Sequence, residues 1–338
     1  MASIGDKLRV IQGAMNPERV KLLDDLREDL GTLPSMGHQP QTRFFRGVEG
    51  LEVNYVTGPA NPYKGIFAFA PACWGNAWDT KKWRRLSPEA RFLDVLATLS
   101  GKSIPNGMES ASFTFEIAGC SRGAFDQIAR QRLGVVFGSM GTRDNEHVDA
   151  DFRIAEALWK NEDAHFNLRS LILIAKNAYT RYVREQGGNW QDAKAFLPAT
   201  VIHRFIACWN FTALRNFAGQ RLRACEQEDT VAVAWLVRER ILERFPLLAA
   251  FLRPTCDWAK RCVYHDGDPL SESYSCLFKG CGRWPEYDDG YATFPTSCSD
   301  YETMQRQAGF TYFPGDAKLV PERYEDLDAK DRALFEED

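Results

Sequence analysis

The chain has 338 residues, of which 44% are hydrophobic and 26% charged, so it can bury a full core as one large domain or two. Its formal net charge of −4 excludes a general attraction to nucleic acid, so any phosphate binding must be local. No apolar segment follows the N-terminus, and the longest apolar runs, such as Val231 to Val237, are too short to cross a bilayer. We therefore expect a cytoplasmic protein without a membrane or nucleic-acid partner.

The nine cysteines are irregularly spaced, and five of them fall in a loop-rich tail that begins near Pro254. No C-x-x-C pair occurs there, since the spacings are Cys256 to Cys262 and Cys276 to Cys281. These spacings are wider than those of structural zinc sites. Reduced thiols are therefore favoured over a zinc site, and no metal centre is predicted.

Before residue 100 the sequence alternates between short elements and turns. We expect helices at Pro17 to Leu30 and from Ser87 to about Leu99, and strands at Val48 to Val56 and Gly65 to Ala70. The tryptophans between these elements favour anchoring of the core and loops over ligand stacking; they are Trp74, Trp78 and Trp83.

A strand followed by a capped helix organises the middle of the chain. Phe113, Phe115 and Ile117 alternate with polar residues, which is the period of a half-buried strand. Ser121 can cap the helix that follows. That helix gathers apolar residues on one side, namely Phe125, Ile128, Ala129 and Leu133.

The polar side chains after Ser121 indicate a site for a phosphorylated ligand. Gln127 and Arg130 are three residues apart and share a helix face, with Gln131 one turn beyond Gln127. The glycine-punctuated loop that follows can present backbone N–H groups to an anion. Its residues are Gly138, Ser139, Met140, Gly141, Thr142 and Arg143.

The second half of the chain is predicted to be mainly helical. We expect two helical pieces between Asp144 and Gly187, then a long helix opening at Leu197-Pro198, then a helix from Glu226 to Phe245. The long helix loses its period near Asn210, so we expect a kink or a new N-cap there. A second helix would then carry Asn216 and Arg221.

Gly119-Cys120-Ser121-Arg122-Gly123 matches G-x-S-x-G between a strand and a helix, which is the setting of a hydrolase nucleophile. Four histidines lie downstream as partners for Ser121. However, a nucleophile-bearing strand is normally buried on both faces, whereas this one carries Thr114 and Glu116. A serine hydrolase is therefore the competing hypothesis. No P-loop and no dinucleotide-binding glycine motif is present.

Two blocks of residues resemble the flavin-dependent thymidylate synthases, and together they cover roughly Glu89 to Pro254. The first block comprises Glu109 to Ile117, Ser121-Arg122, Gln127 and Arg130-Gln131-Arg132. The second block comprises Leu197-Pro198, Trp209-Asn210, Leu214, Asn216-Phe217, Arg221 and Gln227.

The resemblance implies an α+β fold in which long helices cover a small, mostly antiparallel sheet. It divides the chain into an N-terminal extension packed on the core (1–85), a catalytic core (86–254) and a cysteine-containing tail (255–338). It further implies a homotetramer with shared active sites that binds FAD. The expected reaction is reductive methylation of a pyrimidine 5′-monophosphate at C5, with methylenetetrahydrofolate and NADPH as co-substrates.

By position, the resemblance also implies roles for individual residues. Flavin contacts are expected from Arg130, Gln131, Arg132, Asn210, Thr212 and Asn216. Nucleotide contacts are expected from Gln127, the loop Gly138 to Arg143, Lys194 and Arg221. Arg221 is also the expected catalytic residue, because a fixed guanidinium group can polarise a pyrimidine carbonyl.

The chain departs from the family pattern at several of these positions. Gln131 and Ser110 replace histidines, Lys194 replaces an arginine and Cys225 replaces a histidine. In an ungapped alignment Val135 and Met140 replace serines and Thr142 replaces an arginine, whereas a shift of one residue would restore that arginine as Arg143. A retained scaffold with an altered nucleotide loop is similar to the divergent UMP C5-methylase of polyoxin biosynthesis. UMP is therefore the favoured substrate, with dUMP the alternative.

Overall fold

The computed structural model of the chain describes residues 42–73, 81–141, 145–223, 226–255 and 320–338. Several expectations lie outside these ranges, among them the helix at Pro17 to Leu30 and the tail cysteines. In the described ranges, every helix is too short or too polar to span a bilayer.

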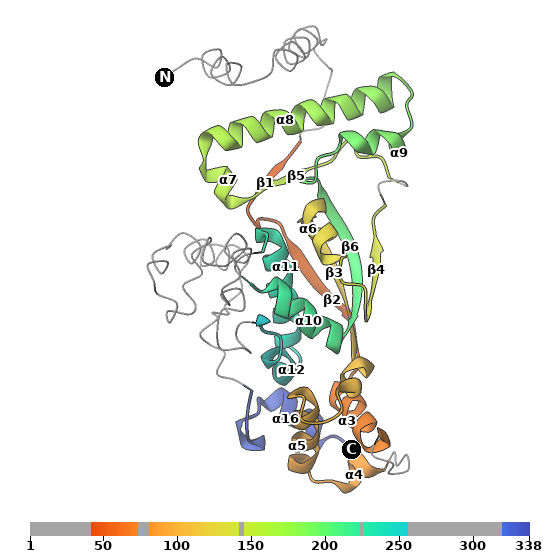
Figure 1. The fold of residues 1–338 in the computed structure, drawn as a ribbon, viewed down its shortest axis with the longest axis vertical. Coiled ribbons are helices and arrows are strands. Elements are labelled where there is room, and N and C mark those ends of the chain that lie inside the picture. The colour runs from red at the N-terminus through yellow and green to blue at the C-terminus, as the bar shows by residue number, and fades with distance from the viewer. Residues whose placement is uncertain (1–41, 74–80, 142–144, 224–225, 256–319) are drawn as a thin grey trace, which may run out of the picture. The chain divides into compact units, whose positions relative to one another are not determined.

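A four-stranded antiparallel sheet forms the centre of the fold, in the order β2-β3-β6-β4 (Figure 1). The strands are β2 (Glu52–Thr57), β3 (Ser112–Ser121), β6 (Ile202–Asn210) and β4 (Val135–Ser139). Helices α6 (Arg122–Ile128), α10 (Phe211–Arg221) and α11 (Glu228–Leu242) contact these strands. This arrangement confirms the α+β class with a small antiparallel sheet.

The alternation predicted for β3 is confirmed. Phe113, Phe115 and Ile117 are fully buried, whereas Thr114 and Glu116 on the opposite face are only partly covered. The strand continues to Ser121, whose hydroxyl accepts a hydrogen bond from the Ala124 backbone N–H at 3.1 Å and so caps α6. Helix α6 ends at Ile128, so the expected apolar face does not extend to Leu133, which is 87% exposed.

The long helix predicted from Leu197-Pro198 is wrong in its first half. Residues 202–210 form β6, in which alternate side chains are buried: His203, Phe205, Ala207 and Trp209. The intervening positions include apolar residues such as Ile206, which made the segment look continuously apolar. The new N-cap expected at Asn210 is confirmed, since its side chain accepts from the Ala213 N–H at 2.8 Å to begin α10.

The strand predicted at Gly65 to Ala70 is also wrong, because these residues lie within helix α3 (Pro62–Cys73). The Asn61 side chain accepts hydrogen bonds from the N–H groups of Tyr63 and Lys64, and Pro62 occupies the first helical position. Asn61-Pro62 is thus the start of a helix. The helix expected from Ser87 is confirmed as α5 (Pro88–Leu99), preceded by the short α4 (Lys82–Arg85) and followed by the 3-10 turn η1 (Pro105–Ser110).

A smaller parallel pair joins β1 (Phe44–Arg46) to β5 (Phe152–Ile154), so the segment after Asp144 is not purely helical. It continues through α7 (Glu156–Lys160), α8 (Glu162–Thr180), the π-helical turn η2 (Arg181–Glu185), α9 (Trp190–Ala193) and the 3-10 turn η3 (Lys194–Phe196). Arg153 of β5 links the pair to the main sheet, because its guanidinium donates to the carbonyl oxygens of Gly119, Gly47 and Glu49.

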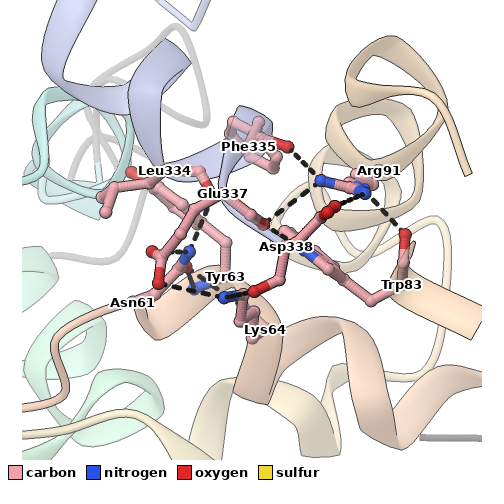
Figure 2. Close-up of polar contacts among 9 residues, drawn as sticks. All are labelled: Asn61, Tyr63, Lys64, Trp83, Arg91, Leu334, Phe335, Glu337 and Asp338. Carbon is pink, nitrogen blue, oxygen red and sulfur yellow. Dashed lines mark hydrogen bonds and ion pairs between the residues drawn. The ribbon is translucent and has the colours of Figure 1, made fainter. Parts of the chain in front are cut away.

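The last residues of the chain fold back onto α3 and α5, as Figure 2 shows. We call residues 320–338 the C-terminal clasp; they include the turn η7 (Tyr324–Asp326) and helix α16 (Ala329–Glu336). Phe335 is fully buried and stacks on Tyr63, with 4.6 Å between the ring centroids. The Asp331 carboxylate accepts hydrogen bonds from the Tyr63 hydroxyl at 2.5 Å and from the Leu247 N–H at 2.6 Å. Leu247 belongs to α12 (Pro246–Ala250), so Asp331 of the clasp connects α3 with α12.

Arg91 fixes the chain terminus itself (Figure 2). Its guanidinium donates to the carbonyl oxygens of Trp83, Phe335 and Glu337 and to the Asp338 side chain. Only 3% of Arg91 is exposed. The clasp is therefore an integral part of the folded core.

Candidate functional site

The end of α10 brings Arg221 against α6. The Arg221 Nη2 group donates to the carbonyl oxygen of Gln127 at 2.8 Å, and Nη1 donates to the carboxylate of Glu226. The Arg221 side chain is 15% exposed. Two residues predicted to contact a nucleotide, Gln127 and Arg221, are thus neighbours although they are far apart in the sequence.

A chain of side-chain amides continues from Gln127 into the fold. Its Nε2 group donates to the Gln227 Oε1 atom at 2.6 Å, and the Gln227 Nε2 group donates to the Ser121 hydroxyl at 3.2 Å. Beneath them, the Asp229 carboxylate accepts from the Ser121 backbone N–H at 2.8 Å. The end of β3 and the helices α6, α10 and α11 therefore meet around one polar network.

Ser121 lacks the geometry of a hydrolase nucleophile. It has an unstrained extended backbone (φ −73°), is 4% exposed, and its hydroxyl bonds to Ala124 and Gln227. His203 of β6 pairs with Cys120 of the neighbouring strand β3. Its ring packs on the Phe125 ring, with 4.7 Å between the ring centroids. Burial, together with the smaller effect of the nearby Arg122 guanidinium, lowers the pKa of His203 to about 4. The serine hydrolase hypothesis is not supported.

The Cys120 thiol is equally unsuited to covalent chemistry. It is fully buried, and this burial raises its pKa well above the ordinary value. A thiol kept in its protonated form is a weak nucleophile. Among the described residues, no three His, Cys, Asp or Glu side chains cluster as a metal site would require.

Gln131 and Asn210 form a second cluster at the start of α10. The Gln131 side chain donates to the Ala213 carbonyl and accepts from the indole N–H of Trp209 at 3.2 Å. Beside them Gly134 has φ 71°, and a Cβ atom there would lie 2.7 Å from the Asn210 amide. Close contact with Asn210 therefore requires glycine at position 134.

Four further residues predicted to bind a flavin flank Gln131 and Asn210 in the sequence. Arg130 and Arg132 are exposed, and neither makes an ion pair or a side-chain hydrogen bond to the described residues. The Thr212 Oγ1 atom is buried, again with no partner within the described ranges. Thr212 and the exposed Asn216 are four residues apart, so they share one face of α10. A buried hydroxyl and two exposed guanidinium groups, all without partners among the described residues, fit a polar, anionic ligand such as FAD.

The predicted nucleotide loop starts at the opposite end of β4. Val135 pairs with Trp209 near the Gln131 cluster, whereas Ser139 pairs with Phe205, about 13 Å further along the strand. Beyond Gly138 and Ser139, the Met140 N–H donates to the Arg204 carbonyl at 3.2 Å, and the Gly141 carbonyl accepts from Asn145 at 2.9 Å. Thr142 and Arg143 lie outside the described residues.

Lys194 is not brought to Arg221 within one chain. It is an exposed residue of η3, which packs beside α8 and α9, whereas Arg221 ends α10 (Figure 1). The predicted residues therefore fall into four places: the Arg221 network, the Gln131 cluster, the β4 loop and η3.

Glu226 is not among the residues predicted from the sequence, and its carboxylate also accepts from Arg223 at 2.7 Å. The spacing of Arg223 and Glu226, three residues apart, is a signal for such a pair. Glu226 lies five positions after Arg221, which ends α10, and this spacing gives no such signal.

The residues of the Arg221 network all lie in a part of the chain that matches one known protein family. The sequence model described as "Thymidylate synthase complementing protein" matches residues 56–247. The flavin-dependent thymidylate synthase of Pyrococcus furiosus is 28% identical over 241 residues, covering 69% of this chain and 94% of that protein. The enzyme of the same name from Nitratidesulfovibrio vulgaris is 27% identical over 250 residues, covering 69% of this chain and 95% of that protein.

A solved structure supports the same fold. The crystal structure of PolB from Streptomyces cacaoi, a UMP/dUMP methylase bound with 5-Br dUMP, superposes with a TM-score of 0.53 at 15% identity. The match covers 62% of this chain and 96% of that one. At this identity the likeness concerns the fold.

Proposed function

Because the chain belongs to the thymidylate synthase complementing protein family, the flavin-dependent thymidylate synthases, we propose that it methylates a pyrimidine nucleoside 5′-monophosphate at C5. The observation that carries the proposal is the convergence of Gln127 and Arg221, both of which lie within the matched region. UMP is the favoured substrate. Methylation of UMP would suit a role in nucleoside-antibiotic biosynthesis.

FAD is the proposed cofactor, with NADPH and methylenetetrahydrofolate as co-substrates. Arg130 and Arg132 would hold its anionic groups, and the buried Thr212 hydroxyl would gain the partner that it lacks among the described residues. Asn210 and Gln131 are already engaged within the chain, so we assign them chiefly to shaping this surface. When bound, the flavin supplies the redox chemistry of the methylation.

The chain itself supplies charge and orientation to the nucleotide. Arg221 uses Nη1 and Nη2 to hold Glu226 and Gln127, which leaves N–H groups to donate to a pyrimidine carbonyl or a phosphate. The loop from Gly138 onward would contribute backbone N–H groups, and Lys194 a point charge.

The separation of these residues within one chain supports an active site shared between copies. In a homotetramer, the β4 loop and Lys194 of one subunit would face Arg221 of another. Analytical ultracentrifugation with and without FAD tests this assembly. A monomeric, active enzyme would contradict it.

UMP is proposed over dUMP because the loop carries hydroxyl groups that can pair with a ribose 2′-OH. Ser139 and Thr142 are the candidates, and a buried hydroxyl left unpaired costs about 1–3 kcal/mol. An ordinary thymidylate synthase acting on dUMP is the alternative.

The test is competition of UMP and dUMP in one reaction containing FAD, NADPH and methylenetetrahydrofolate, read by mass spectrometry of the products. We expect UMP to be converted at least as fast as dUMP. A preference for dUMP of about a hundredfold, equivalent to about 2.7 kcal/mol, would assign the chain to the alternative. Flavin binding without turnover of either nucleotide would indicate a non-catalytic binder.

A further inference from the structure

Glu226 holds two arginines at the candidate nucleotide site. Its carboxylate accepts from Arg221 on one oxygen and from Arg223 on the other, at 2.7 Å for the latter. Only 11% of the Glu226 side chain is exposed, and each arginine side chain is 15% exposed. Two guanidinium groups are thus kept close together by one nearly buried negative charge.

The geometry fixes Arg221 at two points. Glu226 holds Nη1 from one side, and the Gln127 carbonyl holds Nη2 at 2.8 Å from the other. Two contacts on a planar group define the direction of its remaining donors. Without the carboxylate, Arg221 and Arg223 would repel each other, and Arg221 would keep only its bond to Gln127.

We propose that Glu226 is the positioning residue of Arg221, which aims the remaining guanidinium donors at the pyrimidine nucleotide. This inference rests on the proposed function. Glu226 would not touch the substrate, so its effect should reach the reaction only through Arg221. A group aimed before the substrate arrives promotes the reaction more than it promotes binding.

The primary test is Glu226→Gln in the full-length, flavin-loaded enzyme. We expect kcat to fall about 10- to 100-fold, as displacements near 1 Å can cause. The dissociation constant for UMP, measured by calorimetry without co-substrates, should be unchanged or tighter, because a negative charge near an anionic ligand is lost. Glu226→Asp should restore part of kcat. An unchanged kcat, or a loss that appears only in UMP affinity, would overturn the proposal.

Glu243 provides a matched control. It also pairs with two arginines, Arg240 and Arg244, but its side chain is 46% exposed at the C-cap of α11. Glu243→Gln removes the same kind of charge and should leave kcat unchanged. Equal losses from both substitutions would overturn the assignment.

A double-mutant cycle separates positioning from a purely structural role. In an Arg221→Ala background, Glu226→Gln should cause no further loss of kcat, because the group on which it acts is absent. Full additivity would show that Glu226 acts by another route. If the wild-type protein neither binds nor methylates UMP or dUMP, the proposed function fails; if it is active and Glu226→Gln retains kcat, only the Glu226 proposal fails.

Discussion

Arg91 and Arg221 are both largely buried arginines, but they use their donors differently. Arg91 donates to four acceptors, of which the Trp83 carbonyl lies in α4 and the other three lie in the C-terminal clasp (Figure 2). Arg221 donates to two acceptors at the candidate nucleotide site. A guanidinium group has five N–H donors, so within the described residues Arg91 uses four of them whereas Arg221 uses two and keeps three. A guanidinium group whose donors are nearly all bonded within the protein indicates a structural role. A guanidinium group that is held in place but keeps unused donors indicates a ligand site.

The largest effect in this comparison is expected from Arg91→Ala. Two buried carbonyls, those of Trp83 and Phe335, would lose their donor, at about 1–3 kcal/mol each. We therefore expect the free energy of unfolding to fall by about 2–6 kcal/mol in urea titrations. Arg204→Ala, which breaks an exposed pair with Glu116, is the control and should cost less than about 1 kcal/mol. Equal losses would remove the distinction between a saturated and a surface arginine.

Arg221→Ala should instead impair turnover. A charge-assisted contact is worth about 1.5–3 kcal/mol, so we expect kcat/KM to fall roughly 10- to 150-fold. The loss of stability should be smaller than for Arg91→Ala, because Glu226 keeps Arg223 as its partner. Steady-state kinetics and urea unfolding of the same preparation decide this. A variant with wild-type kinetics but a large loss of stability would make Arg221 structural as well.

The clasp should also respond to pH through Asp331. Burial outweighs the hydrogen bonds that its carboxylate accepts and raises its pKa to about 7, from 3.8 in the unfolded chain. Between these values the unfolded chain releases a proton that the folded chain retains, so the free energy of unfolding should fall as pH rises. The slope is at most about 1.4 kcal/mol per pH unit.

Urea unfolding from pH 4.5 to 7.5 measures this slope. Asp331→Asn should abolish the Asp331 contribution to it, although the variant is less stable throughout because its amide cannot accept both hydrogen bonds. An identical slope in the variant would show that Asp331 does not titrate in this range.

The comparison of sequence and structure shows which features are encoded locally. The strand at Phe113 and the cap at Ser121 were predictable, because one face of β3 is apolar and the other carries Thr114 and Glu116. In β6 both faces carry apolar residues, since Ile206 on the outer face is 46% exposed, and periodicity cannot separate such a strand from a helix. The contact of Arg221 with Gln127 joins residues 94 positions apart, which no local pattern specifies.

The smallest effect is expected from Lys194→Ala, and it bears on the assembly of the site. Lys194 is exposed on η3, which packs beside α8 and α9, and these helices lie far from α10 in Figure 1. Lys194 can therefore meet a nucleotide held by Arg221 only if it comes from another subunit. An exposed lysine contributes about 0.2–1 kcal/mol, so UMP affinity should fall by up to about fivefold while kcat is retained. Lys102→Ala removes the same charge from another exposed position and is the control. UMP titrations at low and high salt should show the Lys194 effect shrinking with screening and no effect for Lys102. Equal effects at both positions would indicate general attraction of the anion, and the shared site would lose its support.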